Sequence, residues 1–371
     1  MAGSSPDGAT GEQQNRSRLR WTDPRTPFTW RGWTFGPDVL RFGGNESPYP
    51  PPPELLDAIA GAASRTNRYP FGMESSLVTA LSARLECSPE QVTVAPGTSA
   101  LLEAVIKGLG GPDSEIVCPD SSYPAYRGAA SAVRARTRLV PLRPDGSCDI
   151  DGLANACTER TALVIVCNPN NPTGGMAPTK TLDALIGAMP AHALLMIDEA
   201  YWEFTDEFAQ GGRGAMDYLE CGRPALITRT FSKFYGLAGL RVGYGIASRE
   251  IAGELSARIR LGGSNIIGIV AAEAALGLTN VFTERAERIK AERTRLSQAF
   301  GDLGFDPLPT QANFVFCPHT DDDLPAKLMA AGHWVRDGRS VQMAGGMRVT
   351  VGYPDENDKL LAAIRAIVEP R

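Results

Sequence analysis

The feature that most constrains this chain is a series of seven short apolar runs along residues 91–246, separated by segments of helical character. The runs are rich in Val, Ile and Leu, which is typical of strands covered on both faces. Strands alternating with helices at this spacing indicate a doubly wound, mostly parallel sheet, and therefore an α/β fold. The predicted strands are Gln91–Val94, Glu115–Cys118, Arg138–Leu142, Leu163–Cys167, Ala193–Ile197, Ala225–Thr228 and Val242–Ile246.

The length of 371 residues exceeds what one hydrophobic core usually serves, so a second, smaller domain is expected. Residues 1–40 are rich in Gly, Ser, Pro and Arg and contain three tryptophans, which predicts a partly disordered arm. Residues 41–275 form the predicted large domain, with 41–53 expected to pack near the small one. A long charged helix then opens the predicted small α+β domain, residues 276–371.

Composition excludes several classes of protein. The net charge of −5 comes without a basic run, so nucleic acid is an unexpected partner. No stretch approaches 18 consecutive apolar residues, and the polar first 20 residues lack the apolar centre of a secretory signal. The seven cysteines are scattered without a CxxC pair, and the three histidines are not at ligand spacing. We therefore expect a reduced, cytoplasmic protein without a metal or membrane.

Two loops that follow predicted strands carry groups able to bind a ligand, because ligands collect beyond the carboxyl ends of such strands. In the first, APGTSALLEAVI, a helix starts directly after Gly97, and Thr98 or Ser99 caps it. Exposed amides at a helix start attract phosphate, although a plain helix cap explains the same residues. The second loop, NPNNPTG over residues 168–174, combines rigid prolines with hydrogen-bonding amide side chains.

Two further strand ends carry ionisable groups. Asp198 follows four apolar residues in LLMIDEAYWEF, where a partly desolvated carboxylate needs a cation, such as a pyridinium nitrogen, or strong donors. Lys233 lies in TRTFSKFYGLAGLRVGYG between bulky neighbours, a position that lowers the pKa of a lysine, and Arg241 adds a second cation. A single lysine is usually a solvated surface charge. The other three loops, in a consistent order, favour a catalytic site.

Together these motifs resemble the fold-type I enzymes that use pyridoxal phosphate (PLP), and specifically the class I and II aminotransferases. Within them the resemblance is strongest to the histidinol-phosphate aminotransferase branch. It extends from about Arg41 to about Ala366 and rests on GNESP, NRYP, NPNNPTG, DEAY, TFSKFYGLAGLRVGY, QANF, VRD and MRVTVGYPDEN. It implies an aspartate aminotransferase-like fold, with a large domain and a smaller α+β domain.

The resemblance also implies a role for each matching residue. Lys233 is expected to carry PLP as a Schiff base and to move a proton between the substrate and the cofactor, while Asp198 pairs with the pyridinium nitrogen. Asn171 and Tyr201 would hydrogen-bond the phenolic oxygen of the ring, and Tyr123 would stack on its face. The expected phosphate ligands are Thr98, Ser99, Thr230 or Ser232, Arg241 and, from a neighbouring subunit, Tyr69. A homodimer with shared active sites is therefore expected.

On the substrate side, the resemblance assigns the α-carboxylate of the amino acid to Arg348, aided by Asn313. Tyr49 and Arg336 are further candidate substrate ligands, and for Arg336 a structural ion pair is the competing interpretation. The expected small-molecule partners are an amino donor and a keto-acid acceptor.

The sequence departs from the histidinol-phosphate branch in residues that would contact substrate. These are Pro50 in NESPYPPPP, the Gly262–Gly263 pair and Tyr353. They favour a specialised amino-acid or amine substrate, for example in secondary metabolism. Decarboxylation, β-elimination or amino-acid oxidation on the same scaffold stays an alternative to transamination. A transcription regulator would need a helical DNA-reading domain, for which the first 40 residues lack the apolar periodicity.

Overall fold

The computed structural model describes residues 36, 38–259, 263–319, 321–343 and 345–368. Nearly all of the predicted N-terminal arm, with its tryptophans, and Gly262 lie outside these ranges. Residues 39–371 group as one compact unit, and the predicted boundary at 275/276 stays a prediction. Among the described residues no single helix is long and apolar enough to cross a membrane, whereas α9 (Ile266–Gly277) and α10 (Thr279–Asp302), bent by 82° at their junction, pass that test only as a pair.

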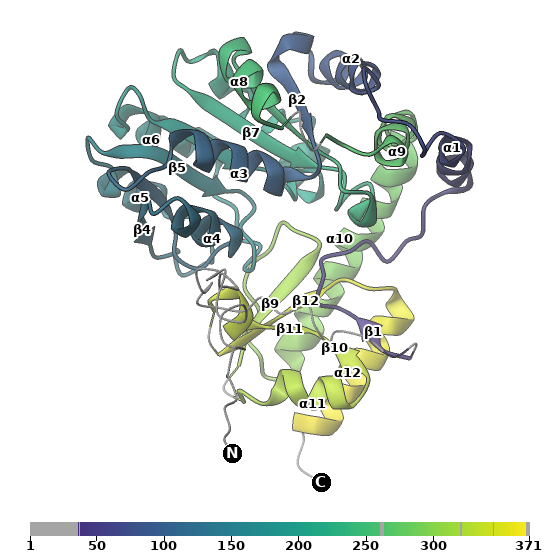
Figure 1. Ribbon diagram of the computed structural model, residues 1–371. Helices are drawn as coiled ribbons and strands as arrows, with labels where there is room; N and C mark the ends of the chain where they lie inside the picture. Colours follow the sequence, from purple (N-terminus) through teal and green to yellow (C-terminus); the bar gives the residue numbers. More distant parts are fainter. Residues whose placement is uncertain (1–35, 37, 260–262, 320, 344, 369–371) are drawn as a thin grey trace, which may run out of the picture. The chain divides into compact units, whose positions relative to one another are not determined.

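A seven-stranded sheet forms the centre of the larger part of the unit (Figure 1). Its strand order is β2-β8-β7-β6-β5-β3-β4, and all neighbours are parallel except that β8 runs antiparallel to both β2 and β7. The mostly parallel doubly wound sheet is thus confirmed, with each predicted strand within two residues of its observed position. The strands are β2 Val92–Ala95, β3 Glu115–Pro119, β4 Arg136–Val140, β5 Thr161–Cys167, β6 Leu194–Asp198, β7 Ala225–Thr230 and β8 Gly243–Ala247.

Both faces of this sheet are buried because successive residues of a strand point to opposite sides. In β5, Leu163 and Ile165 join a core with α3, α4 and α8, whereas Val164 and Val166 join a core with α2, α5 and α6. This explains why the central strands are apolar throughout. The helices are α1 Pro53–Ala63, α2 Glu74–Leu85, α3 Thr98–Leu109, α4 Ala125–Ala132, α5 Ile150–Ala156, α6 Leu182–Ala188, α7 Asp206–Ala209, α8 Arg249–Ile259 and α9 Ile266–Gly277.

The C-terminal part contains a three-stranded antiparallel sheet of order β11-β12-β9, with helices α10 to α12. A short strand near the start of the described chain, β1, pairs with β10 in this part, so residues 40–41 are tied to the C-terminal residues 333–334. The bounds are β1 Leu40–Arg41, β9 Phe314–Pro318, β10 His333–Trp334, β11 Arg336–Asp337, β12 Gly346–Thr350, α10 Thr279–Asp302, α11 Leu324–Ala330 and α12 Pro354–Val368.

The cysteines are distributed between the core and the surface. Cys118, Cys148, Cys167 and Cys317 are buried and all seven thiols are free, but Cys221 is exposed. A small polarizable thiol packs as a hydrophobe, which suits the four buried positions.

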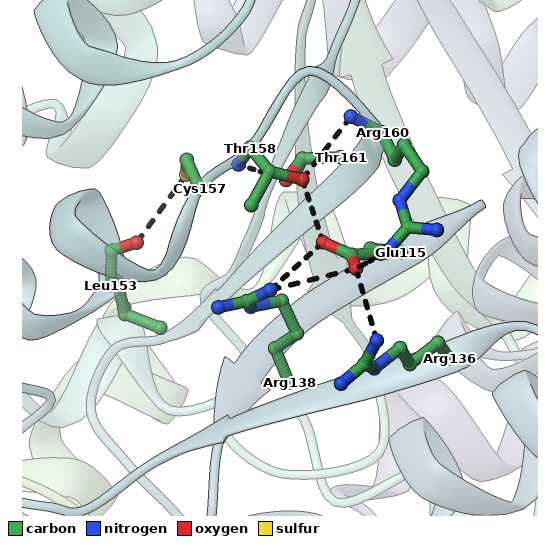
Figure 2. A network of polar contacts seen from close by, with 8 residues as sticks. All are labelled: Glu115, Arg136, Arg138, Leu153, Cys157, Thr158, Arg160 and Thr161. Atoms are coloured by element: carbon green, nitrogen blue, oxygen red, sulfur yellow. Dashed lines mark hydrogen bonds and ion pairs between the residues drawn. The ribbon is translucent and has the colours of Figure 1, made fainter.

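The end of the sheet away from the ligand-type loops is held by a buried carboxylate (Figure 2). Glu115 is 1% exposed and begins β3. It accepts hydrogen bonds from Thr158 Oγ1 at 2.7 Å, Arg160 Nη2 at 2.9 Å and Arg138 Nη1 at 3.3 Å, and Arg136 Nη1 lies 3.9 Å away. These donors keep the carboxylate charged, and their bonds lower its pKa against the opposing effect of burial. Glu115 thereby ties β3 to β4 and to the turn before β5.

We predict that Glu115→Gln lowers the free energy of unfolding by about 1–3 kcal/mol, because hydrogen bonds to a charged group are lost while the arginines can turn to water. Urea unfolding measures the change. The control is Glu284→Gln, which removes an exposed i,i+4 pair with Arg288 and should cost less than about 0.5 kcal/mol. Equal stability of the two variants would contradict the anchoring role.

Candidate active site

The ligand-type loops meet at the carboxyl-terminal edge of the parallel strands, because strands β5, β6 and β7 all end there. Asn168 follows β5, Asp198 closes β6, and Lys233 lies three residues beyond β7. The helix start after β2 reaches the same place, since the ideal position of a Cβ on Gly243 of β8 lies 2.7 Å from the amide nitrogen of Thr98. The structure therefore brings the four loops together at one edge of the sheet, as the sequence predicts.

Lys233 is partly buried and is held by main-chain carbonyls. Its Nζ donates to the carbonyl oxygens of Gly44 at 3.2 Å and Asn45 at 3.0 Å, and lies 5.8 Å from the centre of the Tyr201 ring. Burial lowers the pKa of Lys233 to about 7, with Arg348 adding to the effect. A lysine of this pKa is partly unprotonated at neutral pH, so its nitrogen can act as a nucleophile or a base.

Asp198 is buried and receives only neutral donors among the described residues. The Tyr126 hydroxyl donates to its Oδ2 at 2.7 Å, and the Ala200 amide donates to its Oδ1 at 3.2 Å. Burial raises the pKa of Asp198, and these hydrogen bonds oppose that shift. A buried carboxylate without a cationic partner suits a ligand that brings a positive charge.

A compact anion-binding corner is formed by the start of α3 and Arg241. Gly97 has φ +86°, and a Cβ there would lie 2.6 Å from Arg241 Nη2. Arg241 Nη1 donates to the Ala238 carbonyl at 2.9 Å and to Ser232 Oγ at 3.4 Å. The positive end of a twelve-residue helix and a guanidinium thus occur side by side, which suits a phosphate. Because Gly97 and Gly243 lack a Cβ, Arg241 and the first amide of α3 can approach them this closely.

The candidate hydroxyls at this corner differ in their contacts. Thr230 Oγ1 is buried, donates to the Val242 carbonyl at 3.3 Å and accepts from the Ser232 amide at 3.1 Å, so it orders the loop. Ser232 contacts Arg241 directly. Ser99 Oγ lies 3.3 Å from Tyr123 Oη, which connects the helix start with the residue expected to stack on a ring.

Arg348 is buried on β12 and points toward the large sheet. Its Nη1 donates to Asn171 Oδ1 and its Nη2 donates to the Gly43 carbonyl at 2.7 Å. Burial lowers the pKa of Arg348 to about 10. Its Nε and the Oδ1 of Asn313 are buried without a hydrogen-bond partner in the described chain. Such atoms are rare in native proteins unless a ligand or water completes them.

Asn171 and Tyr201 are expected to donate to the same ligand oxygen, but in this structure they have different hydrogen-bond partners. Asn171 bonds Arg348, whereas Tyr201 Oη accepts from Asn45 Nδ2 at 2.8 Å. Asn45 also has a left-handed backbone, φ 52°, and its carbonyl accepts from Asn313 Nδ2 at 3.3 Å and from Lys233. Sequence reasoning did not assign a role to Asn45, although it lies within the GNESP motif.

The contacts of three further sequence-predicted residues differ in kind. The Tyr49 ring packs edge-on against Tyr353 at 5.1 Å and lies under Arg285, 5.4 Å from its guanidinium carbon. Arg336 Nε donates to the Gly43 carbonyl at 3.1 Å, and its guanidinium lies over Trp334. Tyr69 is 80% exposed beside the 86% exposed Phe71, and its expected contact with a neighbouring subunit stays a prediction.

The fold and site define a class, the aspartate aminotransferase-like PLP-dependent enzymes. The solved histidinol-phosphate aminotransferase of Sinorhizobium meliloti, in complex with PLP, superposes with a TM-score of 0.83 at 28% identity, covering 94% of this chain and 98% of that one. The family model "Aminotransferase class I and II" matches residues 37–364. The chain belongs to this PLP-dependent family, and its activity is that of an aminotransferase.

Curated relatives carry two kinds of name. An aromatic amino acid aminotransferase of Nocardia farcinica is 37% identical over 90% of this chain and 93% of its own length. A histidinol-phosphate aminotransferase of Cupriavidus pinatubonensis is 35% identical over 88% of this chain and 87% of its own. Neither name supports the decarboxylase, lyase or oxidase alternative.

We predict that the Lys233 amine in the cofactor-free protein titrates with a midpoint near pH 7, well below the ordinary lysine value of about 10.4. Reductive methylation at a series of pH values, read by peptide mass spectrometry, measures the midpoint. Arg348→Gln removes a nearby cation and should raise the Lys233 midpoint. A wild-type midpoint above pH 9 would contradict the environment described.

Proposed function

We propose that this chain binds PLP through Lys233 and transaminates amino acids with an aromatic side chain, using a keto acid as acceptor. The observation that carries the cofactor assignment is the grouping, at one edge of the sheet, of a lysine of lowered pKa, a buried aspartate that forms no ion pair with the described residues, and a helix start that faces Arg241. These groups match the aldehyde, the ring nitrogen and the phosphate of PLP, in that order. The donor set fits the cofactor.

The residues that would hold PLP follow from their chemistry. Lys233 would hold it covalently through its ε-amine, Asp198 would face the ring nitrogen, and Tyr123 would cover the ring. Asn171 and Tyr201 would donate to the ring hydroxyl oxygen, and the phosphate would lie among Thr98, Ser99, Thr230, Ser232 and Arg241. When bound, PLP supplies an electron sink that weakens the bonds of the substrate α-carbon.

The chain's own residues then select the reaction. Arg348, whose Nε is a buried donor without a hydrogen-bond partner among the described residues, would grip the α-carboxylate. Asn313 would help through its Nδ2, which donates to the Asn45 carbonyl in this structure, because its Oδ1 is an acceptor. A carboxylate fixed in this way is kept from the orientation that loses CO₂, so the Cα–H bond is the one presented for cleavage. Lys233, partly neutral at pH 7, is the base that takes this proton and later returns one. This favours transamination over decarboxylation.

The preference for an aromatic over a phosphorylated substrate rests on Arg336. Arg336 is bonded to the Gly43 carbonyl and stacked on Trp334, so meeting a phosphate would cost it those contacts. Histidinol phosphate is the second candidate substrate, since Arg336 and Arg348 are register partners on adjacent strands and could together bind a dianion. A cytoplasmic location and a specialised biosynthetic role complete the proposal.

A panel of amino donors with 2-oxoglutarate tests the substrate. We expect tyrosine, phenylalanine or tryptophan to give the highest kcat/KM, and Arg336→Gln to change it less than about tenfold, because an exchanged contact of this kind is worth about 1 kcal/mol. If histidinol phosphate were preferred, and Arg336→Gln abolished that preference, the second candidate would replace the first. Lys233→Ala should abolish turnover with every donor.

The dimer is proposed from Tyr69 and Phe71, two large exposed aromatic side chains in the connection between α1 and α2. We expect Tyr69 to reach the partner's phosphate site, so the PLP dissociation constant of Tyr69→Phe should rise. Light scattering should give a dimer. Mixed Tyr69→Ala and Lys233→Ala subunits should regain part of the activity, because one intact site forms per mixed dimer. Complete independence of the two variants would contradict a shared site.

A further inference from the structure

Tyr126, at the start of α4, contacts the site through Asp198. Tyr126 has no role in the sequence-based assignment. Its hydroxyl lies 2.7 Å from Asp198 Oδ2, a distance typical of a bond to a charged oxygen. Tyr126 is 1% exposed and Asp198 is 6% exposed. The two come from different elements, so the bond fixes the end of β6 against α4.

The proton of this hydrogen bond stays on the Tyr126 oxygen. Burial first, and then the nearby Asp198 charge, raise the pKa of Tyr126 well above its usual value, so the phenol stays protonated and always donates. The second oxygen of Asp198 accepts the Ala200 amide at 3.2 Å. In the described chain no lysine, arginine or histidine forms an ion pair with Asp198. Among the described residues, this buried negative charge is therefore stabilised by neutral hydrogen-bond donors.

The ring of Tyr126 is also fixed. It packs edge-on against the Tyr123 ring, with centres 5.6 Å apart, and belongs to the core shared by α3, α4 and α8. Tyr123 in turn contacts Ser99 at the start of α3. A continuous series of contacts, Ser99–Tyr123–Tyr126–Asp198, thus joins the phosphate corner, the ring-stacking residue and the carboxylate.

We propose that Tyr126 is a positioning residue that keeps Asp198 ionised and oriented toward the ring nitrogen of the cofactor. The inference rests on the proposed PLP function. Tyr126 acts through Asp198 and does not touch the substrate. Removing its hydroxyl leaves the carboxylate with fewer donors, so the carboxyl is more readily protonated and its pairing with a cationic ring is weakened.

The test compares Tyr126→Phe with the wild-type holoenzyme. We expect the PLP dissociation constant to rise and kcat to fall, each by about 10-fold or more, as for a hydrogen bond to a charged group. KM for the amino donor should change less than about threefold, because ground-state substrate contacts are untouched. The pH profile of PLP binding should also move its acidic limb to higher pH. Tyr218→Phe, which removes a hydroxyl bonded to the Thr179 carbonyl, is the matched control and should change none of these.

A double-mutant cycle with Asp198→Asn separates a positioning role from a general loss of packing. If Tyr126 acts through Asp198, Tyr126→Phe should add less than about twofold in the Asp198→Asn background. Full additivity, or a Tyr126→Phe protein with wild-type PLP affinity and pH profile, would overturn the inference alone. A wild-type protein that captures no PLP would overturn the proposed function and this inference with it. Circular dichroism and Tm of the cofactor-free variants show that each is folded.

Discussion

The site depends on how three successive carbonyl groups, those of Gly43, Gly44 and Asn45, meet the cations of the protein. Lys233 donates to the second and third, and Arg336 and Arg348 donate to the first. Without such acceptors, three cations at close range would repel one another in a partly desolvated space. The backbone reaches this arrangement because Gly43, which has no Cβ, approaches the Trp334 ring closely, where a Cβ would lie 2.7 Å from the ring, and because Asn45 adopts a left-handed conformation.

Residues 40–45 also connect the three-stranded sheet of the C-terminal part with the seven-stranded sheet. Leu40 and Arg41 pair with β10, the Thr350 amide donates to the Phe42 carbonyl, and the Lys233 bond links the same segment to the loop after β7. Substrate carboxylate oxygens and main-chain carbonyl oxygens are both acceptors, so a bound amino acid would compete with Gly43 for Arg348.

The sequence was sufficient for what depends on local pattern and insufficient for what depends on distant contacts. Strands and helix starts follow from periodicity, and Lys233, Asp198 and Arg241 follow from their places at strand ends. The sequence did not identify Asn45 and Tyr126, because their contribution to the site consists of hydrogen bonds to residues 156 and 72 positions away in the sequence. A tyrosine in SSYPAY gives no sign that its hydroxyl meets Asp198. Likewise Tyr49 lies in the GNESP region, yet its ring turns toward Arg285 and Tyr353.

Two neighbouring carboxylates show how the fold separates structure from chemistry. Glu199 is buried and paired with Arg229, whose Nε lies 2.8 Å from its Oε2, and it also accepts the Ala215 amide at 2.8 Å. Gly214 makes room for this pair, since a Cβ there would lie 2.5 Å from Glu199 Oε1. Its charge is therefore neutralised inside the protein. Asp198, one residue earlier, has comparable burial, but its donors among the described residues, including the Tyr126 phenol and the Ala200 amide, are neutral. Because its charge is supported without being cancelled, Asp198 retains an electrostatic attraction that a cationic ring can use.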